Sequence, residues 1–191
     1  MDRFQFDKYL IRRKVIKLFG ASFRVFAGED NPILYANLKA FKLKEDIRLY
    51  TGDDMKEEVL VIKARNIIDL GATYDVYESE RNERIGVLKR KGMKSILKDE
   101  WQFLDNNDKQ IGTIKEDNLA LALVRRLLIN IIPQTFTAEI NGTKVCTYVQ
   151  SANPFVSKVR VEYTREADGL LDRRLGIAAG LLLCAVEGKQ N

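Results

Sequence analysis

The residues that most often carry catalysis are scarce in this chain of 191 residues. It contains no histidine, so neither a Ser-His-Asp triad nor a Cys-His pair can be assembled, and no zinc site can use imidazole. The two cysteines, Cys146 and Cys184, are widely separated, which is a poor start for a thiolate metal site. Carboxylates remain, but they gather in turn-like segments such as TGDD and SERNE, where they start turns and face water.

The segment DNNDKQIGTIKE carries enough side-chain oxygens to suggest a calcium loop. An EF-hand loop needs oxygen ligands at alternate positions, a glycine at the sixth and a glutamate at the twelfth. Counted from Asp105, those two positions hold Gln110 and Glu116, so the segment is interpreted as a hairpin turn. Gly86 and Gly112 each stand alone, and neither belongs to a glycine-rich phosphate loop. The sequence therefore predicts a protein that is not an enzyme and has no metal or cofactor.

Two basic clusters are the candidate binding residues. They comprise Lys39, Lys42 and Lys44 in LKAFKLK, and Lys89, Arg90, Lys91, Lys94 and Lys98 in LKRKGMKSILK. The first 50 residues hold eleven Lys/Arg and six Asp/Glu, and so account for the whole net charge of +5. The clusters indicate binding to anionic lipid headgroups, with apolar neighbours such as Phe41 and Met93 inserted beside them. The alternative is that these lysines occupy the solvated faces of strands whose other faces are core.

Apolar and polar residues alternate with a period of two through much of the chain, as half-buried strands require. Val159, Val161 and Tyr163 are one such run. Turn signals recur about every ten residues, and the strongest, Asn141-Gly142, suits a type I′ hairpin. Residues 23–39, 74–91 and 136–150 each have the order of a hairpin: aromatic residue, strand, polar turn, apolar strand. We therefore expect one mainly β domain over residues 1–191, an antiparallel sheet that closes on itself.

The run LGIAAGLLLCAV near the C-terminus contains no charged residue. A bilayer span needs about 20 apolar residues, and these twelve fall short. Asp172 is a suitable N-cap and Gly188 a suitable C-terminal stop, so the pattern predicts a helix over residues 172–187. It would be about 23 Å long, which suits a helix threaded through a barrel. We interpret it as core, with no transmembrane span.

Two further segments bear on location. Residues 118–133, NLALALVRRLLINIIP, have an apolar stripe with Arg125 and Arg126 opposite, and Pro133 ends the pattern. Such a helix could lie on a bilayer surface, or it could plug a barrel end or cover a sheet edge. The N-terminal stretch MDRFQFDKYLIRRK lacks the uninterrupted apolar region of a signal peptide. Together with the low cysteine count, this predicts a cytoplasmic protein, peripheral to the membrane if it binds lipid.

Several long stretches resemble a known superfamily. YLIRRKVIKLFGASFRVFAGEDNPILYANLKAFKLKEDIRLYTGDDMKEEVLVIKAR resembles the LURP-one-related proteins. YDVYESERNERIGVLKRK, LKDEWQFLDNNDKQIGTIKED and DRRLGIAAGLLLCAVE look like the phospholipid-scramblase-like branch of the same superfamily. Both branches resemble the tubby C-terminal domain. The resemblance implies a closed antiparallel barrel of about twelve strands wrapped around the C-terminal hydrophobic helix.

The resemblance also implies three functions. The first is a module that binds anionic phospholipid or phosphoinositide headgroups at a membrane surface. The alternatives are a scaffold for a protein partner and scramblase-like lipid translocation, although the proline-rich and palmitoylated cysteine regions of scramblases have no counterpart here. Nucleic acid binding would need a stronger basic stripe than a net charge of +5 provides.

Overall fold

The computed structural model describes residues 2–16, 20–28, 30–38, 46–68, 71–91, 100–117, 133–151 and 157–186. The strands are β1 (Lys8–Ile16), β2 (Gly20–Ala27), β3 (Asn31–Leu38), β4 (Ile47–Tyr50), β5 (Glu58–Ile68), β6 (Gly71–Glu78), β7 (Glu83–Arg90), β8 (Glu100–Leu104), β9 (Gln110–Glu116), β10 (Gln134–Ile140), β11 (Thr143–Gln150) and β12 (Ser157–Tyr163). A 3-10 turn, η2 (Arg165–Ala167), and an α-helix, α2 (Arg173–Val186), follow.

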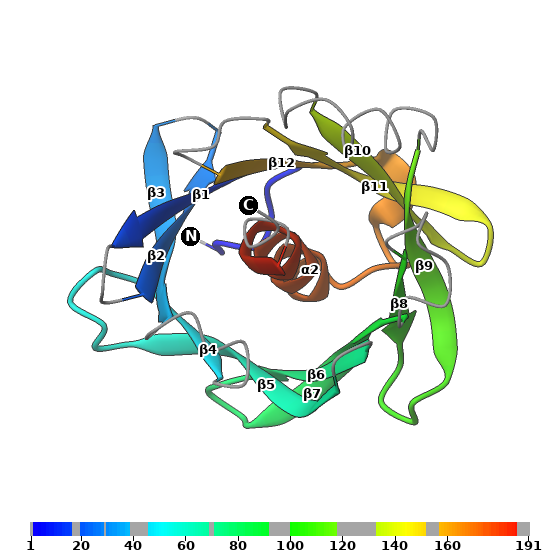
Figure 1. Ribbon diagram of the computed structural model, residues 1–191, viewed down its shortest axis with the longest axis horizontal. Coiled ribbons are helices and arrows are strands. Elements are labelled where there is room, and N and C mark those ends of the chain that lie inside the picture. The colour runs from blue at the N-terminus through cyan, green and yellow to red at the C-terminus, as the bar shows by residue number, and fades with distance from the viewer. Residues whose placement is uncertain are drawn as a thin grey trace.

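The strands form one closed antiparallel barrel around α2 (Figure 1). Each strand pairs with its neighbour in sequence, and β1 closes the barrel by pairing with β12, from Lys8 opposite Glu162 to Arg13 opposite Ser157. Closure leaves no sheet edge to cover. The prediction of a closed barrel of about twelve strands around a C-terminal helix is confirmed.

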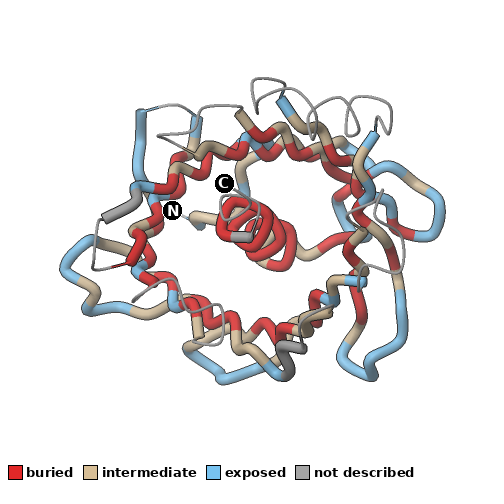
Figure 2. Tube along the Cα trace, viewed as in Figure 1, coloured by how far each residue is buried: buried red, intermediate tan, exposed pale blue. Residues whose placement is uncertain are grey.

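The period of two places alternate side chains inside the barrel. On β1, Tyr9, Ile11 and Arg13 are buried, whereas Lys8 before them and Lys14 after them are exposed. The buried positions form a continuous inner lining, as the alternating colours along the strands show (Figure 2). The predicted hairpins are confirmed as β2–β3, β6–β7 and β10–β11. Asn141 and Gly142 both have positive φ, 50° and 81°, as a type I′ turn requires.

α2 is core, as predicted; it spans Arg173–Val186, and Glu187, the last residue of the predicted range 172–187, lies outside the described residues. The predicted N-cap is confirmed, because the Asp172 carboxylate accepts a hydrogen bond of 2.9 Å from the Arg174 amide. Every residue from 175 to 185 is buried. Tyr148 and Tyr163 hold the helix to the wall by donating hydrogen bonds to the carbonyls of Gly176 and Arg173. No helix among the described residues is long and apolar enough to cross a membrane.

We name the two ends of the barrel from the direction of α2: the helix begins at the entry end and finishes at the exit end. At the entry end, α2 begins at Arg173, and the described turns 51–57, 79–82, 105–109 and 141–142 join the strands. At the exit end, α2 finishes at Val186 beside the finish of β1 and the start of β12, where the Cys184 carbonyl accepts a bond from Arg13. The amphipathic segment predicted over residues 118–133 belongs almost wholly to the undescribed part of the chain.

Candidate functional site

Of the eight basic residues named from the sequence, three are described. Lys89 is exposed on the outer face of β7, whereas Arg90 is half-buried. Lys91 is exposed but forms a 2.6 Å ion pair with Glu100 on the adjacent strand. The remaining five lysines, Lys39, Lys42, Lys44, Lys94 and Lys98, lie outside the described residues, as do Phe41 and Met93.

The strands that flank both lysine clusters meet the same end of the barrel. Antiparallel neighbours alternate in direction, so β3 and β7 finish at the exit end, and β4 and β8 begin there. Leu38 and Arg90 are the last residues of β3 and β7. The described strand ends that precede and follow the two clusters in sequence therefore lie at one end of the barrel, whereas most of the clusters' own residues lie outside the described part of the chain.

The entry end of the barrel is acidic. Its described segments, residues 2–7, 28, 30, 51–57, 79–82, 105–109, 141–142 and 164–172, hold twelve Asp/Glu and five Lys/Arg, a side-chain charge of −7. The sequence that joins the strands at the exit end lies almost wholly outside the described residues. An anionic surface would therefore repel the entry end.

A second basic surface, not named from the sequence, lies on the outer wall. Its members are outward-facing cations of three adjacent strands, and we call it the basic face: Arg12 and Lys14 of β1, Arg24 of β2, and Lys158 and Arg160 of β12. In the strand register Arg12 is directly opposite both Arg24 and Lys158, so three cations lie side by side across the sheet. Adjacent strands are about 4.8 Å apart, so this row spans about 10 Å.

Such a row opposes folding, because like charges placed directly opposite each other on a sheet destabilise it. Ring contacts offset part of the cost: the Arg12 guanidinium lies 4.4 Å from the centre of the Phe26 ring, and that of Arg24 lies 5.9 Å from that of Tyr35. Among the described residues, no carboxylate lies within ion-pair distance of Lys14, Arg24 or Lys158.

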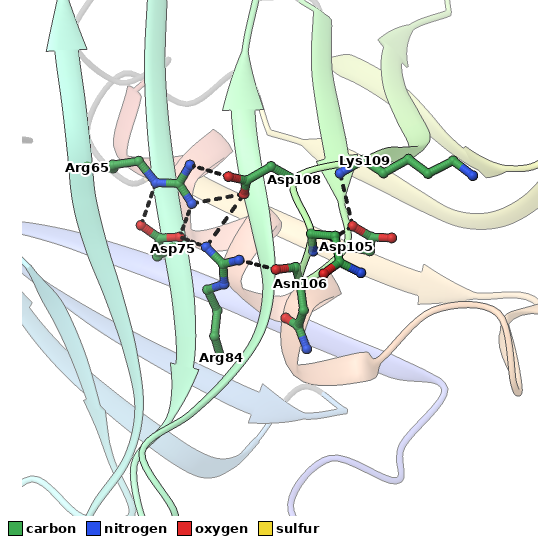
Figure 3. A network of polar contacts seen from close by, with 8 residues as sticks. Arg65, Asp75, Arg84, Asp105, Asn106, Asp108 and Lys109 are labelled. Carbon is green, nitrogen blue, oxygen red and sulfur yellow. Dashed lines mark hydrogen bonds and ion pairs between the residues drawn. The ribbon is translucent and has the colours of Figure 1, made fainter.

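On the outer wall over β5, β6 and β7, two arginines are paired with carboxylates. Arg65 donates to both oxygens of Asp75 and to both oxygens of Asp108, while Arg84 donates to Asp75 and to the Asn106 carbonyl (Figure 3). Hydrogen bonds from Arg65, and then Arg84, hold the pKa of the Asp75 carboxyl below its ordinary value although burial raises it. With two cations against two anions, this network ties the β8–β9 turn to β5, β6 and β7. It explains the DNND segment structurally: the turn is a hairpin, as predicted.

A cleft of about 510 Å³ opens at the entry end. It is lined by Asp2, Phe4, Val59, Glu78, Asp172, Arg173 and Arg174. Its charged groups are engaged within the protein: Arg173 donates to the Phe6 carbonyl at 2.6 Å and pairs with Asp7 at 2.9 Å, and Arg174 pairs with Asp172 at 2.6 Å. These contacts fasten the N-terminal segment across the start of α2, and they engage both arginines of the cleft within the protein.

The cysteines do not offer a nucleophile. Burial raises the pKa of Cys146 to about 12 and that of Cys184 to about 11, so both remain thiols at neutral pH. Within the described part of the chain, no group of three His, Cys, Asp or Glu residues could hold a metal ion.

Sequence reasoning missed the basic face because β1 and β12 are far apart in the chain. Arg12 and Lys158 become neighbours only through barrel closure, and a period-two pattern shows which face a residue occupies but not which strand lies beside it. The positive excess of the first 50 residues is the signal that could have pointed to three of its five members, Arg12, Lys14 and Arg24.

Comparison with known proteins adds no relative, since no family model, curated protein or solved structure matches this chain. Membership of the superfamily that the sequence resembles therefore stays a prediction, and the function has to be argued from the barrel itself.

Proposed function

We propose that the protein is a non-enzymatic module that binds anionic phospholipid headgroups at a membrane surface, as a cytoplasmic peripheral protein. One observation carries the proposal: the basic face sets Arg12 directly opposite both Arg24 and Lys158. An arrangement that costs stability in the isolated protein is favourable when phosphate groups lie against it.

The magnitude is adequate for reversible binding. Each Lys or Arg near an anionic surface contributes about 1 kcal/mol, so Lys14, Arg24 and Lys158 together supply about 3 kcal/mol before orientation costs. This attraction acts over a Debye length of about 8 Å at physiological salt and about 3 Å at 1 M. Binding by the basic face is therefore expected to be weak and strongly salt-dependent.

The acidic entry end also favours one orientation. Lys14 and Lys158 lie on the exit half of the barrel, away from the acidic turns. The acidic turns of the entry end are repelled by an anionic surface. The membrane would then meet the basic face and the exit end together, with the entry end toward the aqueous side.

Vesicle sedimentation tests the proposal. The probes are vesicles of phosphatidylcholine mixed with phosphatidylserine, and pure phosphatidylcholine vesicles for comparison. Reversing two charges of the basic face, Lys14→Glu with Lys158→Glu, is expected to weaken binding by about 30- to 700-fold, which corresponds to about 2 to 4 kcal/mol. The matched control reverses two exposed lysines of the entry end, Lys56→Glu with Lys109→Glu, and retains binding.

Circular dichroism of both double variants checks that the barrel is intact. If wild type does not sediment with the mixed vesicles at low salt, or if the two double variants lose binding equally, lipid binding by this face is wrong. The protein-scaffold alternative would then be preferred.

A further inference from the structure

The cleft of about 510 Å³ at the entry end has a lining of mixed character. Its volume lies within the range of about 300 to 1,000 Å³ that is usual for ligand sites. Two lining residues, Phe4 and Val59, are partly buried apolar side chains that pack against the hydrophobic core. The others are charged: Asp2, Glu78, Asp172, Arg173 and Arg174. A group that enters the cleft therefore meets an apolar surface beside charged side chains.

Both arginines of the cleft are engaged by carboxylates of the protein. Arg173 forms ion pairs with Asp7 at 2.9 Å and with Asp168 at 2.7 Å. Arg174 donates to both oxygens of Asp172, over distances of 2.6 to 3.2 Å. Three carboxylates therefore compensate the two positive charges at the start of α2.

The other two carboxylates of the cleft, those of Asp2 and Glu78, accept hydrogen bonds from neutral groups instead. Asp2 accepts from the Phe4 amide at 2.9 Å and from the Gln5 side chain at 3.1 Å. Glu78 accepts from two backbone amides of the β6–β7 turn, at 3.1 Å and 2.9 Å. Among the described residues, no cationic side chain lies within ion-pair distance of either carboxylate. The cleft therefore has negative charge that a bound cation would neutralise.

The surroundings strengthen this preference for a cation. The described segments of the entry end carry a side-chain charge of −7 before Glu78 is counted, so they attract cations toward the cleft. Lysine and arginine side chains join an apolar stem to a cationic head. In the cleft, the stem would lie along Phe4 and Val59, while the head would meet the carboxylates of Asp2 and Glu78. An aromatic ring such as that of Phe4 also attracts a cation to its face.

We infer that the entry-end cleft is a docking site for a basic segment of a protein partner, which inserts one arginine or lysine side chain. Arginine suits the site best, because its planar guanidinium can donate two parallel hydrogen bonds to a carboxylate. The inference goes beyond lipid binding and does not depend on it. Lys14 and Lys158 lie on the other half of the barrel, so partner and membrane do not compete for one surface.

A nuclear magnetic resonance titration of the untagged full-length protein tests the site without vesicles. The probe is a short glycine–serine peptide with one central arginine and blocked ends. The comparison peptide carries citrulline, which has nearly the shape of arginine but no charge. We expect saturable shifts of the Phe4, Val59 and Arg174 amide signals with the arginine peptide, and a half-saturating concentration about tenfold higher or more with citrulline. No saturable shift, shifts confined to residues away from the cleft, or equal affinity for both peptides would overturn the inference.

Variants separate the cleft from the general negative charge of this end. Asp2→Asn with Glu78→Gln should raise the half-saturating concentration of the arginine peptide about tenfold or more. The matched control, Asp53→Asn with Glu80→Gln, removes two exposed carboxylates that do not line the cleft, and it should bind as wild type does. Because both double variants have the same net charge, an equal loss of affinity in the two would contradict docking in the cleft. If the amide spectrum shows that the cleft variant is unfolded, Asp2→Asn alone replaces it, and wild-type affinity in that variant would contradict the inference.

Discussion

Replacing Gly176 with alanine tests whether α2 is enclosed by the barrel. A Cβ at this position would lie 2.2 Å from the Tyr163 hydroxyl and 2.9 Å from two atoms of its ring. The ring has little room to move, since it packs edge-on against Tyr9 at 6.0 Å and lies beneath the Arg173 guanidinium at 4.9 Å. The substitution therefore displaces Tyr163 and breaks its 2.9 Å hydrogen bond to the Arg173 carbonyl.

The net effect follows from three contributions. Overpacking a filled interior costs about 1 to 3 kcal/mol, and the lost hydrogen bond costs about 0.5 to 1.5 kcal/mol. Alanine is favoured over glycine in a helix by about 1 kcal/mol, which offsets part of this loss. Gly176→Ala should therefore lower the free energy of unfolding by about 0.5 to 3.5 kcal/mol.

Urea unfolding followed by circular dichroism measures this value, and a double-mutant cycle assigns it. In a Tyr163→Phe background the nearest contact is gone, so Gly176→Ala should cost at least about 0.5 kcal/mol less than it does in wild type. If Gly176→Ala instead stabilises the protein by about 1 kcal/mol, as at an open helical position, α2 does not pack inside the wall as described.

Three further predictions concern ionisable groups. Asp75→Asn should lower stability at neutral pH by about 1 to 3 kcal/mol, because it leaves Arg65 and Arg84 with fewer acceptors, and urea midpoints would show it. Because the pKa of Asp75 is lower in the folded state, wild type should also lose this stability as pH falls below about 4. If the stability of the Asp75→Asn variant fell equally steeply with pH in this range, the network's role would be refuted. Burial raises the pKa of Tyr9 and Tyr74 to about 12, so the unfolded state loses these protons first as the pH rises. Stability should therefore fall from about pH 10 upward, and Tyr74→Phe should make that fall less steep. An unchanged pH dependence of stability in this variant would count against the burial of Tyr74. Cys146 and Cys184 should react with an impermeant thiol reagent only after unfolding in urea, and equal native and unfolded rates would contradict their burial.

The fold could be predicted from sequence because its signals are local. The apolar run after Asp172 indicates a buried helix, and the alternation along β12 indicates which side chains face that helix. Both follow from geometry that acts over a few residues. Closure of the barrel was a further inference, made because a sheet of many short antiparallel strands has no unpaired edge strand once it closes on itself.

The candidate site could be predicted only in part, because its residues meet through strand register. Lys91 belongs to a basic run in the sequence, yet the β7–β8 register sets it against Glu100. Arg90 belongs to the same run, but its alternation with Leu88 and Lys89 turns it inward, toward Trp101. Arg12 gains its like-charged neighbour Lys158 from the opposite end of the chain. One sequence does not encode these pairings in any local pattern.

Docking of the basic face onto an anionic membrane is tested most directly with a polarity-sensitive fluorophore attached to single introduced cysteines. The fluorophore reacts selectively with these cysteines because Cys146 and Cys184 are buried. Asn37→Cys places the probe at an exposed position on β3, beside the basic face, since Asn37 is opposite Ser22, which is opposite Lys14. Asn106→Cys places it in an exposed turn of the acidic entry end. On vesicles of phosphatidylcholine and phosphatidylserine, the probe at position 37 should shift to the blue and return to its aqueous emission at high salt, while the probe at position 106 should not change. No shift at position 37, or a shift of equal size at position 106, would contradict docking through the basic face.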